Sequence, residues 1–147
     1  MFNYDDRSQQ LPVAQMTVAR PKEKLDEVVR FYRDGIGLGV VGLQEGQEGY
    51  SEVMLSLPSR VSHLEFSYNE IDSEPSIPSK DDLLVLYMPD KPAVDGIVKR
   101  LGSMGYCPVP AQNSYWARRG TTVQDPDGWK LVLVNTVSAE AGNKKLV

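Results

Sequence analysis

The sequence contains a single cysteine, Cys107, among 147 residues. One cysteine excludes a disulfide within the chain, which suits the reducing cytoplasm, where we expect this protein to reside. A chain of this length buries about 68–70% of its unfolded surface, so it needs neither a disulfide nor a metal to fold. No histidine or second cysteine lies near Cys107 in the sequence, so we expect a packed thiol rather than a nucleophile.

The sequence also lacks the features of a protein that binds membranes or nucleic acids. No apolar run approaches the ~18 residues that a membrane-spanning helix requires. The N-terminal stretch MFNYDDRSQQ has neither a basic nor an apolar segment, so it is not a secretory signal. The net charge is −4, and no dense basic stripe offers a surface to nucleic acid or anionic lipid. We therefore expect no nucleic-acid or membrane partner.

One order of secondary structure, a strand and a helix followed by three strands, is predicted twice along the chain. Apolar residues at helical spacing, β-branched runs and Gly or Pro at the boundaries support both copies. The first copy is predicted to have a strand at 13–20, a helix at 22–34 and strands at 39–43, 50–57 and 61–68. The second is predicted to have a strand at 83–88, a helix at 92–101 and strands at 106–109, at 115–118 with 121–123, and at 130–135.

This repeat predicts an α+β fold built from two βαβββ modules. A helix covers one face of each sheet, and the other face must pack against something or enclose it. We therefore expect the two sheets to form a half-barrel around a shared cavity. The domain is predicted to span 13–136, with modules at 13–68 and 83–136 and tails at 1–12 and 137–147; an acidic, proline-bearing linker joins the modules.

Four segments carry a resemblance to a known superfamily: VARPKEKLDEVVRFYRDGIGLGVV, SHLEF, LLVLYMPD and DPDGWKLVLVN. With these segments the chain resembles the vicinal oxygen chelate superfamily, which includes glyoxalase I, extradiol dioxygenases and the bleomycin- and fosfomycin-resistance proteins. The resemblance implies the paired-module fold. It also implies a homodimer, because members commonly pair or swap modules.

The resemblance has a consequence for metal binding. Metal-using members take one ligand from the first and one from the last strand of each module, and the matching positions here are Gln15, Glu65, Leu83 and Val132. Leucine and valine donate nothing, whereas a protein-bound zinc ion needs about three or four ligands. We therefore expect a member without the full metal site and without a resident cofactor. The alternative is a divalent metal held by Gln15, His63 and Glu65.

Strand alternation predicts which side chains line the cavity. His63 precedes Glu65 by two residues, so both face the same side of their strand. The repeat places Lys130 in the position of His63. The predicted floor consists of Gln15, Thr17, His63, Glu65, Leu83, Val85, Tyr87, Lys130 and Val132.

Two of these side chains are candidates for chemistry. Glu65 and His63 form a candidate acid/base pair, since both residue types exchange protons near neutral pH in suitable surroundings. The candidate ligand-binding residues are Gln15, Thr17, Tyr87, Lys130 and Arg118. Arg118 is included because arginine can clamp a carboxylate or phosphate, and we expect it on the edge strand at 115–118.

Three functions remain open on these grounds. The first is metal-free binding of a small molecule in the cavity, with or without proton transfer by Glu65 and His63. It is favoured because Leu83 and Val132 offer no donor atom to a metal. The second is a metal-dependent lyase, isomerase or dioxygenase with an atypical site. The third is a scaffold whose cavity is filled by its own side chains. Catalysis itself is left open, with glyoxalase- or dioxygenase-like activity as the enzymatic candidates.

Overall fold

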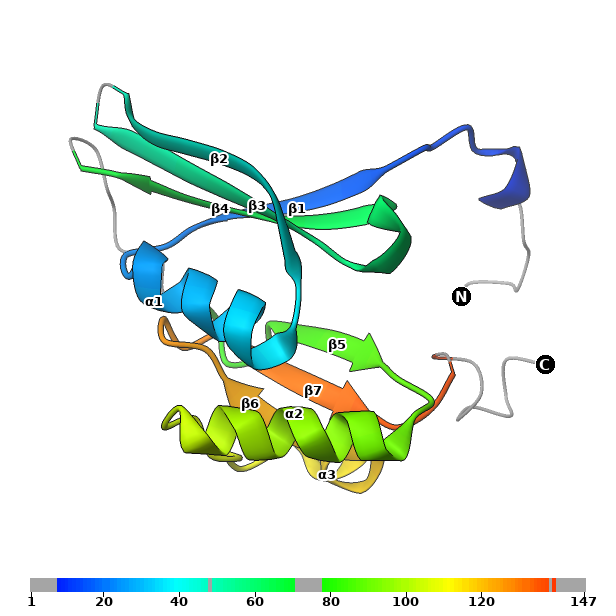
Figure 1. Ribbon diagram of the computed structural model, residues 1–147. Coiled ribbons are helices and arrows are strands. Elements are labelled where there is room, and N and C mark those ends of the chain that lie inside the picture. The colour runs from blue at the N-terminus through cyan, green and yellow to red at the C-terminus, as the bar shows by residue number, and fades with distance from the viewer. Residues whose placement is uncertain (1–7, 48, 71–77, 138, 140–147) are drawn as a thin grey trace.

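The computed structural model describes residues 8–47, 49–70, 78–137 and 139 (Figure 1). After a short turn η1 (Ser8–Gln10), the first module contains β1 (Met16–Pro21), α1 (Leu25–Arg30), η2 (Phe31–Ile36), β2 (Gly39–Gln47), β3 (Tyr50–Ser56), η3 (Pro58–Arg60) and β4 (Ser62–Asn69). The second contains β5 (Leu83–Tyr87), α2 (Lys91–Ser103), α3 (Ser114–Arg119), β6 (Gly120–Gln124) and β7 (Lys130–Val134). Most of both predicted tails and residues 71–77 of the linker lie outside the described residues.

The strands form two mixed sheets, which confirms the predicted α+β fold of two βαβββ-like modules. The first sheet has the order β1-β4-β3-β2, with β1 parallel to β4 and the other pairs antiparallel. The second has the order β5-β7-β6, with β5 parallel to β7. In both modules the strand before the helix thus pairs in parallel with the last strand, as the repeat implies.

The second module departs from the prediction between its two helices. Residues 106–110 form no strand, although the Val109 amide donates to the Thr122 carbonyl (2.9 Å). Residues 115–118, predicted as a strand, lie in α3. The Asn113 side chain caps this helix by accepting from the Trp116 amide (3.0 Å). An Asn cap ahead of good helix formers such as alanine and arginine favours a helix, and the strand prediction was wrong because it overlooked this signal.

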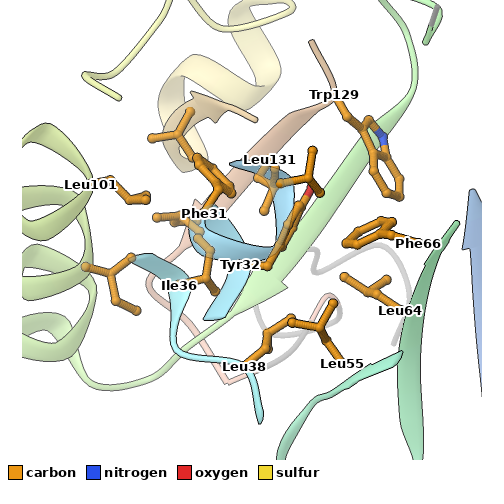
Figure 2. Close-up of a cluster of buried hydrophobic side chains, with 14 of the residues drawn as sticks. Phe31, Tyr32, Ile36, Leu38, Leu55, Leu64, Phe66, Leu101, Trp129 and Leu131 are labelled. Carbon is orange, nitrogen blue, oxygen red and sulfur yellow. The ribbon is translucent and has the colours of Figure 1, made fainter. Parts of the chain in front are cut away.

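One hydrophobic core serves both modules. The apolar side chains of α1, η2 and α2 merge with those of both sheets, and Figure 2 shows Phe31 and Tyr32 between Leu131 on one side and Phe66 on the other. Leu101 of α2 packs directly on Gly35 of η2, where a Cβ atom would collide with the leucine side chain. Glycine at this position therefore lets the two helices approach closely.

This core determines where the outer faces of the sheets point. Leu64 and Phe66 in β4, and Leu131 and Leu133 in β7, turn toward the shared core. Because side chains alternate along a strand, the intervening residues turn away from it. The two sheets therefore enclose the helix α1 between them (Figure 1), rather than a hollow lined by Glu65 and Val132. Within one chain, the residues predicted for the cavity floor therefore lie on sheet faces that point away from the shared core.

Two further observations concern the whole described chain. Cys107 is exposed, so the expected packing of its thiol was wrong. Within the described ranges, no helix is long and apolar enough to span a bilayer.

Candidate functional site

The outward face of the first sheet brings together three of the predicted site residues. Thr17 in β1 pairs with His63 in β4, and His63 pairs in turn with Ser56 in β3. Glu65 is the next residue of β4 on the same face, since Leu64 between them points into the core. Thr17 is exposed and Glu65 is partly exposed, so this face is open in the single chain.

Gln15 does not join this group. It precedes β1, and its side-chain amide donates to the Arg60 carbonyl (3.1 Å). Because Met16 pairs with Ser62 and Ala19 pairs with Glu65, Gln15 precedes the residue opposite Glu65 by four positions. This separation corresponds to roughly 13 Å along the sheet. In the part of the chain that the structure describes, no three His, Cys, Asp or Glu side chains are grouped so that they could hold a metal ion.

The side chain that contacts Glu65 is Glu52 of β3. A hydrogen bond with Glu52 raises the pKa of the Glu65 carboxyl, and burial raises it further. The Tyr50 hydroxyl donates to Glu52 Oε2 (3.2 Å), and burial raises the pKa of this tyrosine. Sequence reasoning missed Glu52 and Tyr50. The alternation in YSEVMLS places both on one face, but only the strand register shows that they lie beside Glu65.

His63 is not the partner of Glu65. Its side chain is 6% exposed, and its imidazole forms no hydrogen bond with any residue that the structure describes. The predicted acid/base pair is therefore two neighbouring groups on one face rather than a bonded couple. Among the described residues, the buried side-chain polar atoms without a partner are Thr122 Oγ1 and Trp129 Nε1, so the nitrogens of His63 reach solvent.

The outward face of the second sheet carries the other predicted residues. Leu83 pairs with Lys130, Val85 with Val132, and Tyr87 with Val134, so these side chains share one face. Lys130 and Tyr87 are partly exposed at opposite ends of it. In the middle, Val132 is completely buried and its neighbour Thr122 is 3% exposed.

The segment that leads into α3 accounts for this burial. It leaves the β6 edge at Val109, and Gln112 then donates from its side-chain amide to Asp81, just ahead of β5 (2.7 Å). The helix α3 returns to the first residue of β6. The chain thus runs from the β6 edge to the residues ahead of β5 and back to β6.

Arg118 lies on α3 and is exposed. Its predicted place on an edge strand at 115–118 is wrong, because these residues form a helix. The neighbouring Arg119 stacks on Tyr115, with its guanidinium 4.3 Å from the ring centroid. The described contacts of α3 therefore do not bring Arg118 to the open face of the first sheet.

A buried polar cluster joins the DPDG turn to the first module. Asp125 accepts from the Lys22 ammonium and from the Tyr32 hydroxyl (both 2.8 Å), and from the amides of Asp127 (2.9 Å) and Trp129 (3.0 Å). Burial, followed by the Asp125 carboxylate, raises the pKa of Tyr32. The carboxylate of Asp125 thus accepts its hydrogen bonds from groups of the protein itself, so the cluster stabilises the fold rather than binding a ligand.

A cavity of about 890 Å³ lies on the other face of the first sheet, beside α1. Its apolar lining includes Leu25, Val29, Val40, Leu43 and Tyr68, and charged side chains of both signs line the rest. It contains none of the predicted site residues. Five acidic and three basic side chains line this groove.

Comparison with known proteins identifies the family. Residues 16–67 match the model of the YycE-like N-terminal domain, and residues 81–135 match that of the YycE-like C-terminal domain. The chain belongs to the YycE-like family. Over 123 residues, 84% of this chain and 88% of the relative, it is 42% identical to YycE of Bacillus subtilis (strain 168). This places it in the glyoxalase, bleomycin resistance and dioxygenase superfamily, as the four sequence segments indicated.

Solved structures agree with this assignment. The crystal structure of YycE from Bacillus subtilis, described as a protein of unknown function, superposes with a TM-score of 0.79 at 40% identity, covering 86% of this chain and 92% of that one. TnmS3, an antibiotic binding protein from Streptomyces sp. CB03234, gives a TM-score of 0.57 at 22% identity (82% and 93% covered). Glyoxalase I from Zea mays gives 0.66 at 16% identity (84% and 45% covered). The last two support the fold alone.

Proposed function

We propose that this protein binds a small organic molecule on the outward face of the first sheet, around Thr17, His63 and Glu65. The observation that carries the proposal is the gathering of exposed Thr17, His63 and partly exposed Glu65 on the sheet face that points away from the core. Convergent polar groups on a concave, partly apolar surface are typical of small-molecule sites. The antibiotic binding protein TnmS3, which shares the fold, supports this class of function.

We infer that a second copy supplies the other wall of this pocket. Within one chain the outward faces of the two sheets point away from each other, and β1 is an edge strand with unpaired backbone groups. Apolar side chains are exposed along this edge: Leu11, Val13, Met16, Val18 and Val61. An exposed apolar edge strand is a docking surface for another chain. Tyr87 and Lys130 of the second copy would then reach the ligand.

The family's metal does not fit the residues of this chain. Leu83 and Val132 offer no donor atoms, Val132 is completely buried, and Gln15 lies far from Glu65. We therefore propose metal-free binding. A second candidate function, favoured by the raised pKa of Glu65, is an enzyme in which this carboxyl donates a proton to the bound compound.

A thermal-shift screen against a library of small molecules tests the binding function. A compound that binds the native state at about 100 times its Kd stabilises the protein by about 2.7 kcal/mol, which raises Tm by several degrees. We expect Thr17→Trp, which fills the face, to abolish the shift. The control Leu43→Trp adds the same side chain at an exposed position of the same sheet and should retain it. Hits that stabilise both variants equally, or the absence of hits, would contradict the proposal.

A further inference from the structure

The strand β2 is an open edge of the first sheet. It pairs with β3 on one side, and no other strand of the described chain pairs with its second side. Its sequence GVVGLQEGQ contains neither lysine nor proline, two residues that commonly protect an edge strand from pairing. Two bulges interrupt its pairing with β3, and Gly42–Gln44 between them keeps a regular register. The backbone of β2 therefore has unpaired hydrogen-bonding groups that a further strand can use.

The side chains of β2 that face α1 form one wall of a groove. Leu43 and Val40 pair with Val53 and Leu55, respectively. Both partners are buried in the core, so Leu43 and Val40 also point to the side of α1. They are nevertheless 62% and 40% exposed, and with Val29 of α1 they line the cavity of about 890 Å³. An apolar groove thus opens beside the free edge of β2.

The charge changes sign along this groove. The first turn of α1 is acidic, and its last turn holds Arg30. Because η2 leads from α1 directly into β2, the C-terminal end of α1 lies near the start of β2, and its N-terminal end lies toward the β2–β3 hairpin (Figure 1). Near the hairpin, Glu45 and Glu70 add two further carboxylates to the lining. One end of the groove therefore carries an excess of acidic groups, with Lys24 among them, and the other end is basic.

We propose that an extended segment of a partner protein binds here as an added antiparallel strand. Its backbone pairs with β2 while every second side chain enters the groove, a mode in which main-chain hydrogen bonds supply affinity and pockets supply specificity. An antiparallel segment begins at the end of β2 and finishes at its start. Its first residues therefore meet the acidic end of the groove, and its last residues meet Arg30. The segment that fits is basic, then alternately apolar, then acidic.

The groove also determines the length of this segment. From Val40 to Glu45 the strand β2 advances five residues, which corresponds to roughly 17 Å. A partner segment of about six or seven residues spans this distance. Thr17 and His63 lie on the opposite face of the sheet from Leu43, so this surface is separate from the proposed small-molecule site.

A peptide designed on these terms tests the proposal. The probe is KKLTLEE, amidated at its C-terminus and labelled with a fluorophore at its N-terminus, and its fluorescence anisotropy is followed as full-length protein is added. The control peptide KELTLEK has the same composition but no net charge at either end. KKLTLEE should bind about tenfold more tightly than KELTLEK, because only KKLTLEE matches the charges of both ends of the groove.

Exchanging the charges of the groove should weaken this binding. Arg30→Glu combined with Glu45→Lys changes two exposed side chains, one at each end, and keeps the net charge. This variant should bind KKLTLEE about tenfold less tightly than wild type. Lys91→Glu combined with Asp95→Lys is the matched control. It exchanges an exposed pair of α2 outside the groove, so it should leave binding unchanged.

Methylation of the peptide backbone distinguishes strand addition from adsorption by charge alone. Successive amides of a strand point to opposite sides, so the amides of the two leucines point one way and the amide of the threonine points the other. N-methylation of the set that faces β2 should abolish binding, whereas N-methylation of the other set should be tolerated.

Several outcomes would overturn the proposal. They are equal binding of the two peptides, binding that survives both methylation patterns, and the absence of binding at millimolar peptide. If Arg30→Glu combined with Glu45→Lys changes the molar mass of the protein, a second copy occupies the groove, and the peptide proposal is again overturned. These results leave the small-molecule site untouched, because the thermal shift with Thr17→Trp tests it separately.

Discussion

Lys22 Nζ lies 2.8 Å from Asp125 Oδ2, and both side chains are almost completely buried. The lysine follows β1 of the first module, and the aspartate opens the DPDG turn of the second. The ammonium group also lies 5.1 Å from the ring centroid of Phe66 and 5.0 Å from that of Trp129. This ion pair therefore fixes the two modules to each other in a setting where neither charge meets water.

Replacing Lys22 with methionine is expected to destabilise the protein strongly. The substitution leaves the Asp125 carboxylate buried without its cation, and removing one partner of a buried pair costs about 3–5 kcal/mol. Urea denaturation of both proteins measures the change. Lys91→Met is the control, because Lys91 and Asp95 form a pair at the same distance of 2.8 Å with 70% and 62% exposure. It should change stability by about 0.5 kcal/mol or less. Similar losses in both variants would contradict the structural role of the buried pair.

Replacing Tyr32 with phenylalanine removes a buried hydrogen bond to Asp125. A hydrogen bond to a charged group contributes about 1.5–3 kcal/mol, and this is the expected loss at neutral pH. The pKa of Tyr32 is raised above its unfolded value by burial. Its contribution is therefore complete below about pH 10 and decreases as the pH rises further, since the unfolded state then loses the proton first.

Urea denaturation from pH 7 to 11 tests this dependence. The other tyrosines titrate in both proteins, so the difference in stability between wild type and Tyr32→Phe isolates this hydroxyl. The difference should stay constant up to about pH 9 and shrink above about pH 10. A difference that is independent of pH would show that folding does not raise the pKa of this hydroxyl.

Glu52→Gln should stabilise the protein at neutral pH. The Glu52 hydrogen bond raises the folded-state pKa of Glu65 above its unfolded value. Its stabilising contribution is therefore present below the unfolded pKa and is lost as the pH rises through the folded one. The Glu52→Gln variant does not undergo this loss of stability. Its free energy of unfolding relative to that of wild type should therefore increase between pH 4 and pH 8, by less than about 1 kcal/mol because the site is partly exposed. Thermal unfolding across that range measures it, with Glu45→Gln showing no such trend.

Gly35→Ala should destabilise the contact between η2 and α2. The new methyl group would collide with Leu101, and overpacking of this kind costs about 1–3 kcal/mol. Leu101→Val removes the colliding atoms, so the double variant should lose less than the sum of the single losses. The control is Gly96→Ala in α2, where nothing lies within 4 Å of the new atom. This substitution should stabilise the helix by about 0.5–1 kcal/mol. Additive losses in the Gly35–Leu101 cycle would show that the two residues do not touch.

The proposal that a second copy of the chain forms the other wall of the pocket is tested by measuring the molar mass of the protein in solution. Light scattering during size-exclusion chromatography should give the mass of a dimer for wild type. Met16→Glu places a charge on the exposed edge of β1 and should give a monomer that no longer binds ligand, whereas Leu43→Glu on β2 should remain dimeric. A monomeric wild type that still binds its ligand would show that one chain suffices.

Local patterns in the sequence predicted most of the elements, but not the way they meet. Helical spacing and turn residues located α2 and all seven strands to within a few residues, and alternation placed His63 and Glu65 on one face. The helix α3 was missed because its Asn cap was overlooked in a segment with two aromatic residues, which favour strands. Glu52 was missed because its contact with Glu65 depends on the register of two strands, and the Lys22–Asp125 pair because 103 residues separate its members.

The most direct test of the account is an amide NMR titration with the compound that gives the largest thermal shift. If the ligand binds on the outward face of the first sheet, the resonances that move will cluster on Tyr50, Glu52, His63 and Glu65. If they cluster instead on Leu25 and Val29, in the groove beside α1, the assignment of the functional site is wrong.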